Sequence, residues 1–111
     1  PPSQAALAKI NTQSNPPIAE RFELYIQGIE IANGFHELNN AKEQYQRFTD
    51  NQKIRKEHNT TIPTIDSRFI DALTHGLPDC SGVAIGIDRL MMMFCNSHNI
   101  KEIMSFNWDN A

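Results

Sequence analysis

Three features are scarce in this sequence: cysteine, positive charge and long apolar runs. Its two cysteines, Cys80 and Cys95, have no paired spacing, which argues against a disulfide framework or a cysteine metal site and predicts reduced, buried thiols in the cytoplasm. Ten lysines and arginines stand against thirteen acidic residues, and the net charge of −3 excludes a nucleic-acid-binding surface over the whole domain, leaving only a local basic patch possible. No apolar run approaches the roughly 20 residues that a membrane-spanning helix needs.

The length and the start of the chain limit the domain organisation that can be expected. Its 111 residues suffice for one small domain, and no internal repeat is visible. The first residue is Pro1 rather than an initiator methionine, and the start lacks the basic and apolar regions of a signal peptide. We therefore expect a processed or excised piece that contains a single domain.

Polarity patterns predict an α+β fold, a mostly antiparallel sheet flanked by helices. Residues 21–37 alternate between polar and apolar and are typical of two strands, with Gln27-Gly28 as the tight turn between them. Strands precede and follow the predicted helices without the βαβ alternation of a parallel sheet. Residues 1–17 are rich in Pro, Ser, Asn and Gln, and we expect them to be irregular apart from one helical turn within 5–10.

Two helices are predicted between the strands. Residues 41–58 are rich in helix formers, and Asn40 is suited to cap their start. Residues 66–75 form the second predicted helix, with Asp66 as its cap and Gly76 as its end. These signals predict that the two helices lie between an early pair of strands and a single later strand.

The stretch 81–90 predicts a strand with one nearly bare face, followed by a short helix over 90–95. Small side chains at Gly82, Ala84 and Gly86 alternate with bulky ones at Val83, Ile85 and Ile87. A flat ligand could lie against the bare face, while the bulky face is expected to pack into a core. Asp88 can cap the helix, so Arg89 would lie in its first turn, where a guanidinium and free N–H groups both favour phosphate. The alternative is a tightly packed strand with a surface arginine.

A pair of carboxylates lies on the predicted hairpin. With a two-residue turn, Glu23 faces Ala32 and Tyr25 faces Glu30, so Glu23 and Glu30 become diagonal neighbours about 7–8 Å apart on one face. Magnesium takes one or two carboxylates together with phosphate oxygens, and these two side chains could bind it. The alternative is a solvated sheet face carrying two glutamates without a ligand.

Polar residues continue at the end of the hairpin. Asn33 and Glu37 alternate with Phe35, and a buried Glu37 would need a cationic partner such as a lysine ammonium. The alternative is a strand end that turns toward a helix cap. Regular alternation places these residues on the face opposite Glu23 and Glu30, and a bulge near Gly34 would bring the two sets together.

In their order and spacing, these motifs resemble the C-terminal part of the catalytic domain of lysyl-tRNA synthetases, which are class II aminoacyl-tRNA synthetases. The matching segments are 21–23, Gly28, Glu30, 33–35, 37–39, 46–48, 72–73, 75–78 and 82–89. The last segment resembles motif 3 of class II enzymes, with Ala84 where the middle glycine usually stands. The resemblance implies that residues 1–111 are the C-terminal portion of a class II catalytic core that lacks motifs 1 and 2.

Within this family the chain is similar to the synthetase-like ligases that attach (R)-β-lysine to a lysine of translation elongation factor P. The similar segments are 2–5, 31–37, 78–82, Ala84 and 106–111. Residues 94–100 look more like the tRNA synthetases themselves. The resemblance thus implies an ATP-dependent ligase. Two alternatives are a lysyl-tRNA synthetase that acts on tRNA(Lys) and a non-catalytic paralogue that binds lysine or nucleotide.

The resemblance also implies roles for individual residues. Glu23 and Glu30 would bind the magnesium that holds ATP, Arg89 would contact the γ-phosphate, and the strand at Gly86 would lie under the nucleotide. Arg89 and Glu30 are thereby the expected catalytic residues. The expected substrate-binding residues are Asn33 and Glu37, which would hold the amino acid, Phe35, which would pack on the substrate or nucleotide, and Gly82, Ala84 and Gly86, which would floor the pocket.

The reaction implied is adenylation of a lysine-like carboxylate by ATP, followed by transfer. The acceptor would be a lysine amine of elongation factor P, or a tRNA ribose hydroxyl in the synthetase alternative. The resemblance further implies a homodimeric parent in the cytoplasm without membrane contact. Because motifs 1 and 2 are absent, we expect the fragment alone to be inactive, with exposed sheet edges, and either weakly stable or dimeric through an interface other than the family's.

Overall fold

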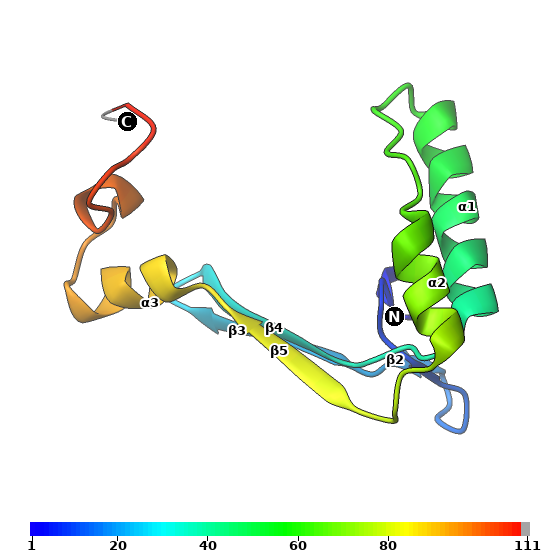
Figure 1. The fold of residues 1–111 in the computed structure, drawn as a ribbon. Coiled ribbons are helices and arrows are strands. Elements are labelled where there is room, and N and C mark those ends of the chain that lie inside the picture. The colour runs from blue at the N-terminus through cyan, green and yellow to red at the C-terminus, as the bar shows by residue number, and fades with distance from the viewer. Residues whose placement is uncertain (110–111) are drawn as a thin grey trace.

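A three-stranded antiparallel sheet lies at the centre of the molecule (Figure 1). The computed structural model describes residues 1–109, so positions 110–111 of the segment used in the resemblance lie outside it. The strands are β3 (Arg21–Ile26), β4 (Ile29–His36) and β5 (Ser81–Ile85), in the order β3-β4-β5. Gln27 and Gly28 both have positive φ, 51° and 79°, as a two-residue hairpin turn requires. The predicted hairpin, the last strand and the α+β class are confirmed.

Three helices follow the predicted caps with one exception. Helix α1 (Ala41–Glu57) begins where the Asn40 side chain accepts a backbone hydrogen bond, and α2 (Ser67–His75) begins at Asp66 in the same way and ends at Gly76. Helix α3 (Ile87–Phe94) starts earlier than predicted, and the expected cap at Asp88 is wrong. The N–H of Gly86 still bonds the Ile31 carbonyl at 2.9 Å, so the chain passes directly from strand to helix and leaves Asp88 in the first turn.

The N-terminal segment is more ordered than its composition predicts. It contains a 3₁₀ turn, η1 (Pro2–Gln4), and a small sheet of β1 (Ile10–Asn11) and β2 (Ile18–Ala19), while most of the remaining residues up to 17 are irregular, as expected. The helical turn expected within 5–10 is wrong. Backbone bonds to the end of β4 explain the difference. Lys9 N donates to His36 O at 2.8 Å and Leu38 N donates to Leu7 O at 2.9 Å. These tertiary bonds override the local helical preference.

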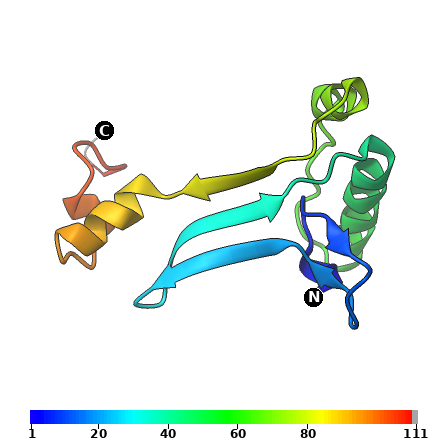
Figure 2. The same cartoon turned by 90° about the horizontal axis from the view of Figure 1, so that it is seen from below.

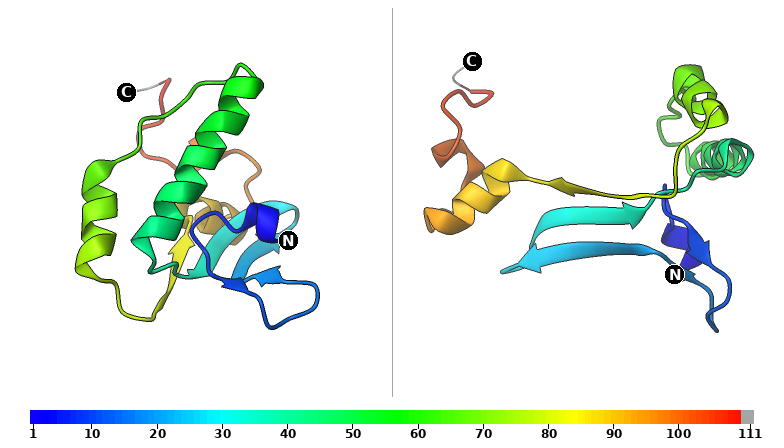
Figure 3. Two further views of the ribbon diagram at one scale, coloured as in Figure 1. Left: turned by 90° about the vertical axis from the view of Figure 1, so that its right-hand side faces the viewer. Right: turned by 60° about the horizontal axis from the view of Figure 1, so that its bottom comes forward.

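The elements are arranged openly rather than around one centre. Helices α1 and α2 stand at one end of the central sheet, and α3 with the 3₁₀ turn η2 (Ile100–Glu102) lies at the other end (Figures 1 and 2). The right-hand view in Figure 3 shows the same separation, and the left-hand view looks at the end that carries α1 and α2. The radius of gyration is 17.5 Å, whereas a compact chain of this size has about 13 Å. These residues therefore form an open arrangement rather than a compact one.

One face of the central sheet is apolar and uncovered. Val83, Ile85 and Ile87, which were expected to pack into a core, are 56%, 51% and 62% exposed. Phe22 and Leu24 continue this surface on β3 and are likewise exposed. Because cross-strand partners share a face, these side chains form one continuous patch that no part of residues 1–109 covers.

Two other predictions from composition have separate outcomes. Cys80 and Cys95 are both free thiols, as predicted, but neither is buried as expected, because Cys80 is half-buried and Cys95 is exposed. The position of Cys95 just after α3 explains its exposure, because α3 turns only Met92 fully inward. Within residues 1–109, none of the helices combines the length and the apolar character that crossing a bilayer requires.

Candidate functional site

A bulge in β4 brings the two predicted sets of polar residues to one face of the sheet. Glu23 pairs with Asn33 and Tyr25 pairs with Glu30, while the register shifts between Leu24 and Tyr25. Leu24 faces Ala32, so Ile31 is the extra residue. The expected pairing of Glu23 with Ala32 is therefore wrong, and so is the expected bulge position near Gly34. The bulge nevertheless brings the two sets of polar residues together, because Glu23, Glu30 and Asn33 share a face.

The third strand adds its bare side to the same face. Asn33 pairs with Ala84 and Phe35 pairs with Gly82. A Cβ atom placed on Gly82 would lie 2.6 Å from Oε1 of Glu37, so the Glu37 carboxylate lies directly over this glycine. We call this surface the site face; its residues are Glu23, Glu30, Asn33, Phe35, Glu37, Gly82 and Ala84.

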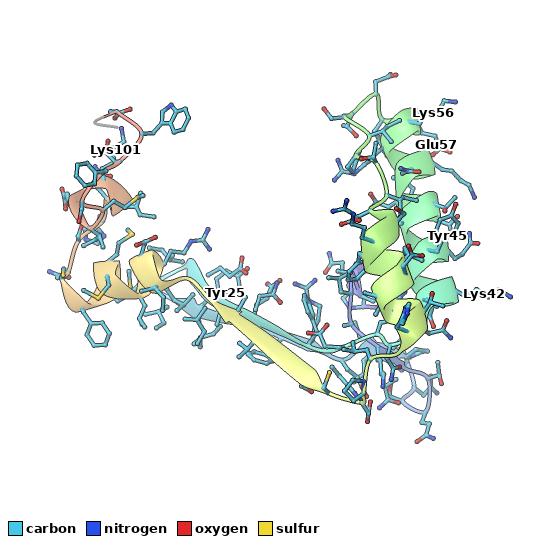
Figure 4. All side chains as sticks on the ribbon, viewed as in Figure 1. Tyr25, Lys42, Tyr45, Lys56, Glu57 and Lys101 are labelled. Carbon is cyan, nitrogen blue, oxygen red and sulfur yellow. The ribbon has the colours of Figure 1, made fainter. Side chains whose placement is uncertain are left out.

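Arg21 is a member of the site face that the sequence prediction missed. Its guanidinium forms an ion pair with Oε1 of Glu23 and lies over the Phe35 ring, 5.5 Å from the centroid. The Tyr25 hydroxyl donates to the other Glu23 oxygen at 2.9 Å, which raises the pKa of Tyr25 (Figure 4). The alternation of Arg21, Glu23 and Tyr25 on one strand was the available signal, because residues two apart share a face.

The carboxylate pair suits a magnesium ion. Glu23 and Glu30 lie on diagonal positions of adjacent strands, because Glu30 faces Tyr25, the next residue on the same face of β3 after Glu23. No cluster of three or more histidine, cysteine or acidic side chains within residues 1–109 is placed to hold a metal. A cage made only of protein ligands is therefore not present in this part of the chain. Two hard carboxylates that leave positions for phosphate oxygens match the way magnesium is usually bound with a nucleotide.

Arg89 lies at the same end of the sheet as Glu30. It is the third residue of α3, and its Nη1 donates to the Glu30 carbonyl at 2.8 Å. Gly86 leaves room for this side chain, because a Cβ atom at Gly86 would lie 3.3 Å from Cδ of Arg89. The guanidinium and the N-terminal turn of α3 thus present positive charge beside the carboxylate pair.

Unpaired acceptors mark the other end of the site face. Oδ1 of Asn33 is shielded from solvent and has no hydrogen-bond partner within residues 1–109. Over the same residues, the Glu37 carboxylate forms no salt bridge. A buried acceptor without a donor costs free energy, which applies to the Asn33 oxygen, and the half-buried Glu37 carboxylate attracts positive charge, so both groups favour a ligand that carries N–H donors or a positive charge.

The site face is an open surface at this end rather than an enclosed pocket. The largest cavity, about 950 Å³, lies between the N-terminal segment and α1 and touches the site face only at Arg21 and Glu23. Asn33 and Glu37 line none of the three cavities described. Residues 1–109 therefore provide one wall of a binding site and leave the opposite side uncovered.

On the roles that the resemblance implies, with the amino acid over Gly82 and the nucleotide over Gly86, alanine at each of these glycines is expected to affect a different substrate. The new methyl group at Gly82 must displace the Glu37 carboxylate, so KM for the amino-bearing substrate should rise about tenfold with KM for the nucleotide unchanged. Gly86→Ala should instead push Arg89 aside and raise KM for the nucleotide. Steady-state kinetics of both variants in the full-length protein check this, and equal effects of both variants on both constants would contradict the assignment.

The chain was compared with families and with curated proteins. Residues 1–110 match the family described as tRNA synthetases class II (D, K and N). Among curated proteins, the chain is 50% identical to a protein of Haemophilus ducreyi and 52% identical to one of Hamiltonella defensa, each over all 111 residues. Both are named elongation factor P–(R)-β-lysine ligase, as is a Salmonella dublin protein at 49% identity. The chain spans 34% of the length of each of these relatives.

Proposed function

Because the chain belongs to the class II tRNA synthetases of the D, K and N type, we propose that it is part of an ATP-dependent ligase of the lysyl type. The ligase activates a lysine-like amino acid as its adenylate and transfers (R)-β-lysine to a lysine of translation elongation factor P. The observation that carries the proposal is identity of about half over the whole chain to relatives named for that reaction. The cytoplasm, where translation factors act, is its proposed location.

We assign residues 1–111 to the C-terminal portion of a class II catalytic core, with motif 3 at 82–89. The open site face and the uncovered apolar patch both fit a chain that spans a third of its relatives. The rest of the catalytic core would supply motif 2, which closes the site, and motif 1, which forms the homodimer interface. The 111 residues alone should therefore not catalyse adenylation.

The nucleotide end of the proposed site consists of Glu23, Glu30 and Arg89. The two carboxylates would bind magnesium, which neutralises phosphate charge when it is bound. Glu23 is paired with Arg21 and Tyr25 in this structure, so binding of a metal would compete with these two partners. Arg89 would contact the γ-phosphate, and the backbone at Gly86 would lie beneath the nucleotide. Arg89 and Glu30 act as catalytic residues by holding the triphosphate in line for attack.

The amino-acid end consists of Asn33, Glu37 and the bare strand. The Asn33 oxygen and the Glu37 carboxylate accept from the two amino groups of a lysine-like substrate, which satisfies acceptors that are otherwise unpaired. Phe35 packs against the substrate or the nucleotide. Gly82, Ala84 and Gly86 form a floor on which the flat part of the substrate lies.

These contacts position a reaction in two steps. First, a carboxylate oxygen of the substrate attacks the α-phosphorus of ATP, a new phosphorus–oxygen bond forms, and pyrophosphate leaves. Second, a neutral amine of the acceptor lysine attacks the adenylate carbonyl, an amide bond forms, AMP leaves and one proton is released. The protein's contribution is positioning and charge stabilisation in both steps.

Ala84→Gly is expected to shift the preference between lysine isomers. The Ala84 methyl group lies beside Asn33 in the sheet register, and removal of one methyl group from a tight pocket changes specificity by about 1–3 kcal/mol. The ratio of kcat/KM for (R)-β-lysine to that for α-lysine should fall about tenfold. ATP–pyrophosphate exchange measures it. Ala6→Gly is the matched control, because Ala6 already has a positive φ of 50° that glycine adopts without strain.

The acceptor is tested by offering both candidates to the full-length protein. With ATP and (R)-β-lysine, the proposal predicts that elongation factor P gains the mass of one β-lysyl group and that tRNA(Lys) stays uncharged. Charging of tRNA(Lys) without modification of the factor would favour the tRNA synthetase alternative, for which residues 94–100 are the supporting segment. If neither product forms, the non-catalytic paralogue is the remaining alternative.

A further inference from the structure

A network of four charged side chains joins four segments of the chain at the end of β4. The His36 ring lies between two carboxylates, with Nδ1 2.5 Å from Oε2 of Glu20 and Nε2 2.7 Å from Oδ1 of Asp79. The Lys9 ammonium forms an ion pair with the same Asp79 oxygen and lies 3.3 Å from Nε2 of His36. None of these residues belongs to the site face, because His36 follows Phe35 and points to the opposite side.

The contacts favour a protonated His36 ring. A carboxylate oxygen only accepts, so two carboxylates that face the two ring nitrogens favour a ring in which both nitrogens donate, while the Lys9 ammonium beside Nε2 opposes the positive charge. The hydrogen bonds to Asp79 and then Glu20 raise the pKa of His36, although partial burial and Lys9 oppose this. Lys9 and then His36 lower the pKa of Asp79. With His36 protonated, two positive and two negative groups balance.

The network is joined by the backbone to the amino-acid end of the site face. His36 directly precedes Glu37, and Asp79 stands three residues before Gly82. Glu37 N donates to Cys80 O at 3.0 Å, and His36 pairs with Ser81 across the strands. The side-chain bond between His36 and Asp79 therefore fixes the two segments whose separation sets the position of the Glu37 carboxylate over Gly82.

We propose that His36, held by Glu20 and Asp79, is a positioning residue that sets the Glu37 carboxylate against Gly82 and so determines the affinity of the site for the amino-bearing substrate. This inference rests on the proposed function. His36 does not touch the substrate or the nucleotide in this account. Its effect reaches the substrate through the adjacent Glu37 and through the Asp79–Gly82 segment.

The charges restrict the stabilisation that the network contributes to a defined pH range. A histidine with a raised pKa contributes its stabilisation fully below its ordinary value of about 6.5 and loses it as pH rises through the raised value. Asp79, with a lowered pKa, contributes above its ordinary value and loses its contribution as pH falls through the lowered one. Substrate affinity should therefore be highest between these two limits and should weaken above the pKa of His36.

Kinetics of the full-length protein test the proposal across about pH 6 to 9. ATP–pyrophosphate exchange with (R)-β-lysine is measured for the unsubstituted protein, His36→Gln and the control His98→Gln, which replaces an exposed histidine outside the network. The expected KM for (R)-β-lysine in the unsubstituted protein rises about tenfold as His36 loses its proton. In His36→Gln this KM should be high throughout without a pH step, while kcat and KM for ATP stay within about twofold. His98→Gln should match the unsubstituted protein.

Asp79→Asn provides a second measurement if His36→Gln folds poorly. It removes the carboxylate that raises the pKa of His36 most, so the pH step in KM should move to lower pH. An unchanged pH step in both variants, or a fall of kcat together with a rise of both KM values, would overturn the positioning role and leave the proposed function intact. Absence of exchange by the unsubstituted protein at every pH would instead overturn the proposed function, and this inference with it.

Discussion

Arg89→Ala in the full-length protein is expected to lower kcat for ATP–pyrophosphate exchange by about a hundred- to a thousandfold. The guanidinium lies at the start of α3 with Nη1 on the Glu30 carbonyl, so it is held beside the carboxylate pair before any nucleotide arrives. Its loss removes a charge-assisted donor to the triphosphate at the moment when charge moves onto the leaving pyrophosphate. Exchange kinetics at saturating lysine substrate measure the effect.

Arg68→Ala is the matched control for this prediction. Arg68 is also an arginine in the first turn of a helix, but it is exposed on α2 at the other end of the sheet. It should leave kcat within about twofold, as substitutions of exposed residues usually do. Equal losses in both variants would indicate a general effect of arginine removal, and full activity of Arg89→Ala would exclude its catalytic role.

Glu37→Gln is expected to reduce kcat/KM for the lysine substrate by about a hundredfold or more. The substitution keeps the shape of the side chain and its place over Gly82 but removes the negative charge opposite the substrate ammonium. An amide also presents donors toward a group that itself only donates. The loss should appear mainly in KM for the amino acid, with KM for ATP within about twofold, and substrate titrations in the exchange assay separate the two constants.

Glu57→Gln serves as the control for the charge change. Glu57 is the last residue of α1, exposed and distant from the site face (Figure 4). It should leave both KM values unchanged. A rise in KM for ATP that equals the rise for lysine in Glu37→Gln would contradict the division of the site face into a nucleotide end and an amino-acid end.

Local chemistry explains why much of the fold was predictable. Gln27-Gly28 is a turn because the hairpin needs two positive φ angles, and the starts of α1 and α2 follow from Asn40 and Asp66, whose side chains accept backbone hydrogen bonds. The bare strand 81–85 is equally local, because its alternation of small and bulky residues has the period of a strand. Each signal lies within a few residues of the feature that it determines.

The relation between strands could not be predicted in the same way. The extra residue at Ile31 has no signature in the sequence, since a bulge depends on pairing between strands rather than on one of them. Without it, Asn33 and Glu37 would lie opposite Glu23 and Glu30. The N-terminal strands and the interactions of Arg21 with Glu23 and Phe35 likewise depend on tertiary contacts.

The exposure of the patch of Phe22, Leu24, Val83 and Ile85 also could not be predicted from the strands themselves. The sequence correctly predicted an apolar side for β5, but a core needs a second surface to pack against it. Within residues 1–109 no element provides that surface. Hydrophobic alternation identifies which side of a strand is to be covered, and it carries no information on the part of a protein that covers it.

Adenylation of a lysine-type acid on the site face is measured by ATP–pyrophosphate exchange with the full-length protein. (R)-β-lysine and α-lysine are offered side by side with ATP and magnesium. We expect exchange that strongly prefers (R)-β-lysine. A preference for α-lysine would contradict the ligase and favour the tRNA synthetase, and no exchange with either acid would contradict both and leave a binding paralogue.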